Sequence, residues 1–242
     1  MLVHADCESR PLLPVPSAGW LKRIGLTKRD YAAICALVNS YQGLVVAADL
    51  DPVYRRFPAV NATRSEFYTS LSDGRCIFVH TRRVKARATL VWDVAHLLGH
   101  MFQWNMTAQQ GQRHGLRYHG VRARQLAVRD FRGASSEVLK RVLRYELEAG
   151  RFAYTALLKI RGAPPHSPFA AAVADYVVHD LAFITGYYLR RQPSRTADAV
   201  HDPVLGPELA AIRGELGVVA LPDPDTFRFR SFDLLSVPVV HD

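Results

Sequence analysis

The sequence predicts an α+β protein, in which a few short strands precede a series of long helices. Two apolar segments, 66–71 and 75–80, flank Ser72-Asp73-Gly74, and an Asp-Gly turn between such segments predicts a β-hairpin. Longer segments with the helical spacing of apolar residues follow it, at about 84–104, 136–161 and 167–191. This order of short strands and long helices is typical of the α+β class.

Capping residues mark the ends of several elements. Thr27 is a suitable N-cap for a helix that stops before Gly43. Ser135 or Ser136 can cap the helix that Gly162 and the following prolines end. Ser167-Pro168 has the order of a cap and a first-turn proline, and it begins the next helix.

The other segments carry weaker signals. Leu44-Val45-Val46 is apolar and predicts a short strand, whereas 49–64 predicts a loop or short helix. Residues 105–133 have little apolar periodicity, so we expect a loop, which can include a short helix. Near the end, 206–216 predicts a short helix, and the alternation in 226–232 predicts a strand.

Length and composition suit a globular domain with an extension. The chain has 242 residues, of which 49% are apolar and 22% charged. We divide it into a Pro-rich segment at 1–26, a core domain at 27–162 and a C-terminal helical extension at 163–242, packed on the same domain. We find no secretory signal and no apolar run long enough to span a bilayer, so no membrane is expected.

Cysteine content and charge bear on location and partners. Three scattered cysteines form no metal or redox motif, which suits a reducing cytoplasm, and the Arg-rich composition suggests a bacterial protein. The net charge is +9, and Arg113–Arg151 holds ten Lys/Arg against four acids, a net +6. We interpret this stretch as a solvated face, because no nucleic-acid-binding motif accompanies it. A small-molecule or peptide ligand, including an anionic one, stays open.

The segment Trp92–His100 carries the most specific signal in the chain. His96 and His100 are four residues apart in a helix-compatible run, which places both imidazoles on one face. H-E-x-x-H proteins hold zinc with this spacing. Leu97, however, occupies the position of the glutamate that acts as general base in those proteins.

A third ligand is expected on the helix at 136–161. At 100° per residue, Glu146 lies about 40° from the centre of the apolar stripe of this helix, and Glu148 about 120° away. A glutamate near an apolar stripe is costly unless it is paired or bound to metal, so Glu146 is the better ligand candidate. Glu148 is then a supporting residue or a surface acid.

These motifs resemble the ImmA/IrrE metallopeptidase-like family. The order of strand 76–79, the run 95–100 containing both histidines, and the run 146–153 beginning with Glu146 is similar to that family's H-E-L-G-H and E-x-E-A-N-x-F-A patterns. The resemblance covers roughly 65–160. It implies a zincin-like fold with a small mixed sheet packed on the active-site helix, and one divalent ion, zinc, held by His96, His100 and Glu146.

The chain departs from the family pattern in several ways. Leu97 replaces the catalytic glutamate, and Gly150 replaces an asparagine. The stretch 101–145 is longer than usual, and the N-terminal helix-turn-helix of some members is not evident. The first departure argues against conventional peptide hydrolysis, because a leucine cannot activate a metal-bound water.

Another acid could take over the role of the missing base. Asp93 precedes His96 by three positions on the same face, and it could also form a first-turn salt bridge. Glu148 is a second option for a relocated catalytic residue. His114, Tyr118, His119 and Tyr154 lie near the motifs in sequence, but each alone is more often structural.

Three functions follow from this pattern. The first is a metalloenzyme other than a peptidase, since two histidines and one carboxylate also bind iron(II) in non-haem enzymes. The second is an inactive pseudo-metallopeptidase that serves as a binding or regulatory domain. The third is a zinc hydrolase with its base relocated to Asp93 or Glu148.

Overall fold

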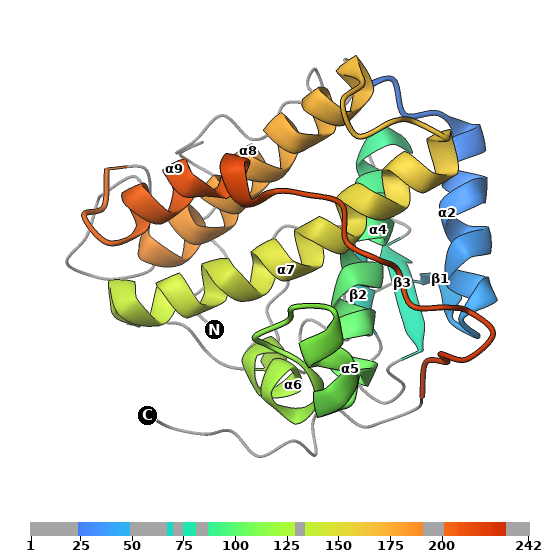
Figure 1. The fold of residues 1–242 in the computed structure, drawn as a ribbon, viewed down its shortest axis with the longest axis horizontal. Coiled ribbons are helices and arrows are strands. Elements are labelled where there is room, and N and C mark those ends of the chain that lie inside the picture. Colours follow the sequence, from blue (N-terminus) through green and yellow to red (C-terminus); the bar gives the residue numbers. More distant parts are fainter. Residues whose placement is uncertain are drawn as a thin grey trace.

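Two long helices cross at the centre of the molecule (Figure 1). The computed structural model describes residues 24–48, 67–69, 75–80, 87–128, 134–190 and 201–230. Helices α4 (Arg87–Asn105) and α7 (Ser136–Arg161) form the crossing, with α2 (Lys28–Ser40) against α4 and α8 (Pro168–Arg190) against α7. The fully buried side chains of α4, from Val91 to Phe102, supply much of the core.

Local signals define the helix ends as the sequence predicted. Thr27 caps α2 in a reciprocal pair with Asp30, and Ser135 caps α7. Gly162 ends α7 with φ of 60°, a conformation that favours glycine. Arg161 Nη2 then donates to Asp30 Oδ2 at 2.8 Å, which joins the end of α7 to the start of α2.

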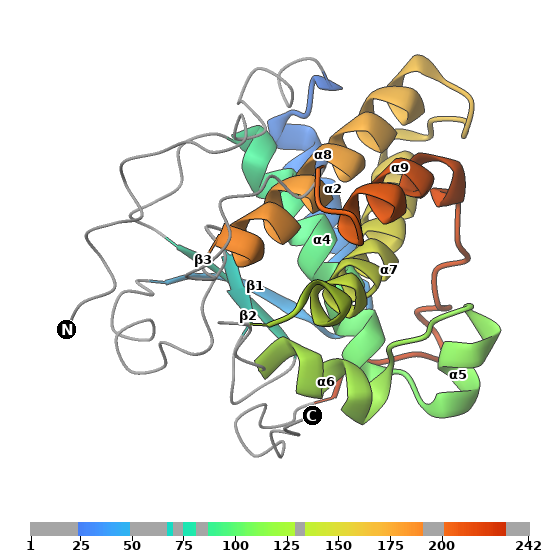
Figure 2. The ribbon, with the colours of Figure 1, turned by 90° about the vertical axis from the view of Figure 1, so that its left-hand side faces the viewer.

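The strands form a small mixed sheet beside α4 (Figure 2). Its order is β1 (Leu44–Ala48), β3 (Cys76–His80) and β2 (Phe67–Thr69). Strands β2 and β3 are antiparallel, which confirms the predicted pairing, whereas β1 runs parallel to β3 with Leu44 opposite Cys76. The predicted turn at 72–74 and the segment 49–64 lie outside the described residues.

The expectation of a loop over 105–133 needs correction. Two helices lie there, α5 (Ala108–Arg113) and α6 (Gly120–Val128). Thr107 caps α5 through a reciprocal pair with Gln110, a local signal that apolar periodicity does not detect in so short a helix.

The predicted C-terminal strand is also wrong over the described part, 226–230. After α9 (Leu205–Glu215), which confirms the predicted short helix, the chain returns across α7 and α4 (Figure 1). Phe227 and Phe229 alternate because both pack against Phe102 of α4, not because a neighbouring strand pairs with them. Residues 231 and 232 lie outside the described residues.

Helix α8 shows that the prediction of no apolar run long enough to span a bilayer was wrong. Its residues Pro168–Gly186, 19 in all, are long and apolar enough to cross a membrane by length and composition alone. In the fold, 44% of this stretch is buried, and α8 packs on α7 and α9. A helix that contributes to the core of a domain has the same composition.

Candidate metal centre

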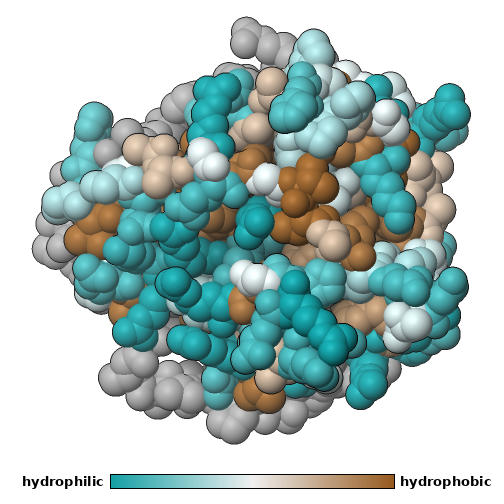
Figure 3. All heavy atoms as spheres, in the orientation of Figure 1, coloured by the Kyte–Doolittle hydropathy of each residue, from teal (hydrophilic) through white to brown (hydrophobic). Residues whose placement is uncertain are grey.

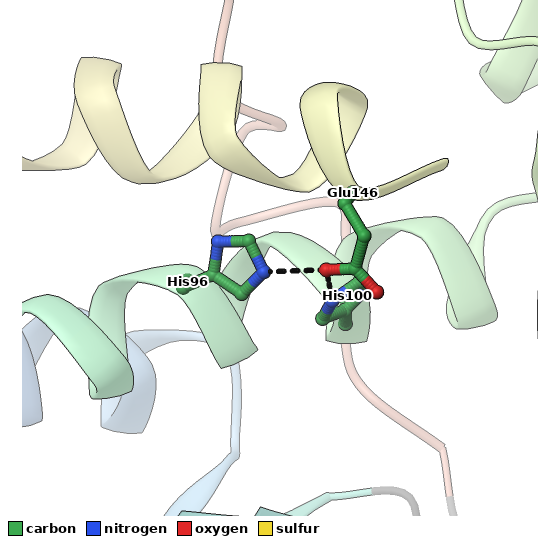
Figure 4. Close-up of side chains that lie close together, drawn as sticks. All are labelled: His96, His100 and Glu146. Carbon is green, nitrogen blue, oxygen red and sulfur yellow. Dashed lines mark hydrogen bonds and ion pairs between the residues drawn. The ribbon is translucent and has the colours of Figure 1, made fainter. Parts of the chain in front are cut away.

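Two histidines of α4 and one glutamate of α7 converge between the helices (Figure 4). His96 and His100 lie one turn apart, as their spacing predicted, and are 9% and 6% exposed. Glu146 reaches them from α7, with Oε2 at 2.9 Å from His96 Nε2 and 3.1 Å from His100 Nε2. The structure therefore brings together the three residues predicted as ligands.

Their donor atoms are spaced closely enough to share one ion. All three lie within 4.8 Å of one another. Donors on one tetrahedral zinc are about 3.3 Å apart, because metal–ligand bonds are about 2.0–2.1 Å long. In the part of the chain that the structure describes, no other cluster of three His, Cys, Asp or Glu side chains has such spacing.

A close contact between the two helices sets this geometry. A Cβ atom added to Gly99 would lie 2.3 Å from the carbonyl oxygen of Ala149, so a larger residue does not fit without a shift. Ala95 and Ala153, one turn along each helix, are fully buried as well. The glycine between the two histidines thus allows α4 and α7 to approach until Glu146 spans the gap.

Gln103 fixes the orientation of the His100 ring. The Gln103 Nε2 group donates to Tyr145 O at 2.9 Å and to Glu148 Oε2 at 3.2 Å. Its Oε1 atom is left facing His100 Nδ1 at 2.9 Å, so Nδ1 must carry the proton that it donates. His100 Nε2 is then the nitrogen that faces Glu146, and it can exchange the proton that it shares with this carboxylate for a metal ion.

Glu148 supports this arrangement and does not join the ligand cluster. Its Oε1 atom accepts from Arg117 N at 2.7 Å, and its Oε2 atom accepts from Tyr118 N at 3.0 Å as well as from Gln103. It is buried, so the alternative of a surface acid is wrong. Burial raises the pKa of Glu148 although these hydrogen bonds lower it. The contacts favour the supporting role over that of a relocated base.

The other nitrogen of His96 has different surroundings. His96 Nδ1 is buried and has no hydrogen-bond partner among the described residues. The ring packs against Trp92 at 5.7 Å between centroids, and Trp92 Nε1 donates to Asp180 Oδ2 of α8 at 3.1 Å. Burial raises the pKa of Asp180 to about 6, although the charge of His96 lowers it.

Asp180 and Gln103 are residues that sequence reasoning missed. Asp180 is one of two acids, with Asp175, in a largely apolar stretch of helix, and that contrast could have flagged it. Gln103 follows His100 by three positions on the same helix face, where a supporting hydrogen bond is within reach.

The residues of the cluster shift one another's pKa values. Burial disfavours the charge of Glu146, but the charge of His100 and the hydrogen bonds from both histidines outweigh it, so the pKa of Glu146 falls well below its usual range. Burial likewise opposes protonation of His96, yet the hydrogen bond and charge of Glu146 raise its pKa. Protons and a metal ion therefore compete for the same nitrogen.

Asp93 and Leu97 lie on α4 beside the histidines. Asp93 is half-buried, and its charge helps to raise the pKa of Tyr176, although burial is the larger cause. Leu97 packs against the core and presents no group that can transfer a proton. A catalytic role for Asp93 stays a prediction.

The remaining candidates lie outside the ligand cluster. Tyr118 meets Glu148 through its backbone, and Tyr154 Oη donates to Pro165 O at 3.4 Å. His114 lies against Phe152, and His119 lies over Gly111. A role for these four residues in the site stays a prediction.

Comparison of the chain with protein-family models, with characterised proteins and with solved structures gave no match. The resemblance to the ImmA/IrrE family and the zincin-like fold therefore stay predictions, and they rest on the motif residues.

Proposed function

We propose that this protein is an enzyme that depends on one divalent metal ion, held by His96, His100 and Glu146, and that it is not a conventional peptidase. The convergence of both Nε2 atoms on one carboxylate oxygen carries this proposal. Buried charged groups are rare unless they are paired or bound to metal. This cluster offers a metal ion three ligand atoms, namely two imidazole nitrogens and one carboxylate oxygen.

The donor set fits zinc or iron(II). Two imidazoles and one carboxylate leave coordination positions open, as catalytic sites of both metals do. When bound, the ion would supply a Lewis acid or, in the case of iron, a centre for oxygen chemistry. Gln103 orients His100 for this purpose, since it holds the proton on Nδ1.

Leu97 argues against peptide hydrolysis by the usual route. A hydrolytic metal site needs a base within hydrogen-bond reach of the attacking water. The leucine instead gives the site an apolar neighbour at this position, packed against the core.

Metal analysis of the purified protein tests the proposal. We expect about one zinc or iron ion per chain, and a loss of affinity beyond 100-fold in His96→Ala and in Glu146→Ala, because each removes a ligand. His166→Ala is the matched control, since His166 is exposed and lies far along the chain from the cluster. Absence of metal in the wild type, together with partner binding that His96→Ala leaves unchanged, would favour the pseudo-metallopeptidase instead.

Asp180 favours a second candidate, a metal-dependent hydrolase with a relocated base. Its Oδ2 atom is held by Trp92, and Oδ1 has no hydrogen-bond partner among the described residues. A carboxylate whose pKa is about 6 can take a proton from a water near neutral pH. Zinc-dependent hydrolysis of an ester or amide that is lost in Asp180→Asn, but kept in Asp93→Asn and Glu148→Gln, would support it. Iron with oxygen consumption would exclude it.

A further inference from the structure

A hollow lies on another face of α7. It has a volume of about 340 Å³, at the lower end of the range for small-molecule sites. The surface around α7 and the loop before α6 is largely hydrophilic (Figure 3). Its lining combines part of α7 with the loop before α6 and the end of α9, and we call it the arginine pocket: Gly115, Arg117, Arg144, Leu147, Glu148, Arg151 and Glu215.

The acids of the arginine pocket are already engaged. Glu215 forms an ion pair with Arg144, which also pairs with Glu208 of α9. Glu148 accepts from two backbone N–H groups and from Gln103. Among the described residues, neither acid forms an ion pair with the two other arginines of the pocket.

Arg117 and Arg151 lack a bonded acid, although the charge of Arg117 acts on Glu148 at longer range. Within the described ranges, neither guanidinium forms a hydrogen bond or an ion pair. The Nε atom of Arg151 is buried and has no partner there, a condition that is rare in native proteins. Arg117, by contrast, is exposed.

We propose that the arginine pocket binds the oxyanion group, phosphate or carboxylate, of a small molecule. A guanidinium presents planar N–H donors that match both oxyanions in pairs. An oxyanion would satisfy Arg151 Nε and would balance the charges of Arg117 and Arg151. The site is separate from the metal centre, because its lining includes none of His96, His100 and Glu146.

Titration calorimetry of the intact chain tests this proposal, with inorganic phosphate in one arm and acetate in the other, at constant ionic strength. We expect at least one of the two anions to bind, and the double variant Arg117→Gln/Arg151→Gln to bind it at least 10-fold more weakly, because each lost guanidinium removes charge-assisted hydrogen bonds. Binding of phosphate alone would identify a phosphoryl ligand, and binding of acetate alone a carboxylate ligand.

Two controls distinguish the arginine pocket from the rest of the basic surface and from the metal centre. Arg113→Gln removes one charge from the same basic stretch at an exposed position outside the pocket, and it should leave the affinity unchanged. Glu146→Ala should also leave it unchanged, which excludes binding at the metal centre. The single variant Arg117→Gln tests the exposed side chain if the double variant does not fold. Absence of binding of both anions, or equal affinity in the wild type and the variants, would overturn the proposal.

Discussion

His96 and His100 meet the same oxygen of Glu146, but their other ring nitrogens lie in different surroundings. His100 Nδ1 donates to Gln103, which Tyr145 O and Glu148 hold in turn. His96 Nδ1 is buried and lacks such a partner among the described residues. The ring of His96 is positioned by packing on Trp92 instead.

This contrast suggests that the two ends of the site have different tasks. The hydrogen-bonded His100 end has a fixed tautomer and a fixed ring plane, which suits a permanent ligand. At the His96 end, Nδ1 lacks a hydrogen-bond partner among the described residues, and Asp180, whose pKa is raised, lies within electrostatic reach. The protonation of this end can therefore respond to a ligand or to pH.

The largest effect is expected from Gly99→Ala, which acts on both ends together. Its Cβ atom would lie 2.3 Å from Ala149 O, so α4 and α7 must separate. We expect a loss of unfolding free energy of about 3 kcal/mol and loss of metal binding. Chemical denaturation checks this, with Gly214→Ala as the control, since a Cβ there meets no atom within 4 Å. Gly214→Ala should be neutral or slightly stabilising. Equal free energies of unfolding of the two variants would show that the contact at Gly99 does not limit how closely α4 and α7 approach.

Gln103→Leu tests the His100 end alone. The variant keeps the size of the side chain but removes the acceptor of the Nδ1 proton, so His100 can rotate or change tautomer. We expect the metal dissociation constant to rise about 10- to 100-fold, as for other residues that orient a ligand. Competition with a chromophoric chelator measures it, and Gln109→Leu on exposed α5 is the control. An unchanged constant would mean that packing alone orients both rings.

Asp180→Asn tests the His96 end, and its effect should be confined to pH above about 4. Because the folded-state pKa of Asp180 is raised to about 6 from 3.8, the folded chain holds more protons than the unfolded chain between these values. The free energy of unfolding therefore falls as pH rises from about 4 to 6. The asparagine variant lacks this fall, and it should be more stable than wild type at pH 7 by up to about 3 kcal/mol, but not at pH 3.5.

Denaturation at a series of pH values measures this difference. Asp175→Asn, on the same helix but paired with Arg213, should keep the wild-type fall between pH 4 and 6, because Asp180 remains. A parallel pH profile for Asp180→Asn and wild type would contradict the raised pKa.

Features encoded by neighbouring residues could be predicted from the sequence. Thr27, Ser135 and Gly162 set helix ends through groups three or four positions away, and the strand pairing of the hairpin is similarly local. The convergence of the three candidate ligands was also predictable, because helical spacing puts His96 and His100 on one face and helical phase places Glu146 near the apolar stripe of its own helix.

Features that depend on contacts between distant segments were not predictable in this way. Asp180 accepts a hydrogen bond from Trp92, which lies 88 positions earlier in the sequence, and no local sequence pattern predicts that contact. Phe227 and Phe229 alternate as a strand would, but their partners lie on α4 and between α2 and β1, so the same pattern has another cause. The phase argument likewise placed Glu148 on the flank of α7, where the loop before α6 covers it.

The contact of Gly99 with Ala149 fixes which acid can complete the site. Since the two backbones already touch there, the helices cannot move closer to make up for a shorter side chain. An aspartate at position 146 would end one carbon–carbon bond, about 1.5 Å, short of where the glutamate ends. The contact thus fixes the distance between α4 and α7, and glutamate is the acid whose side chain is long enough to meet both imidazoles across that distance.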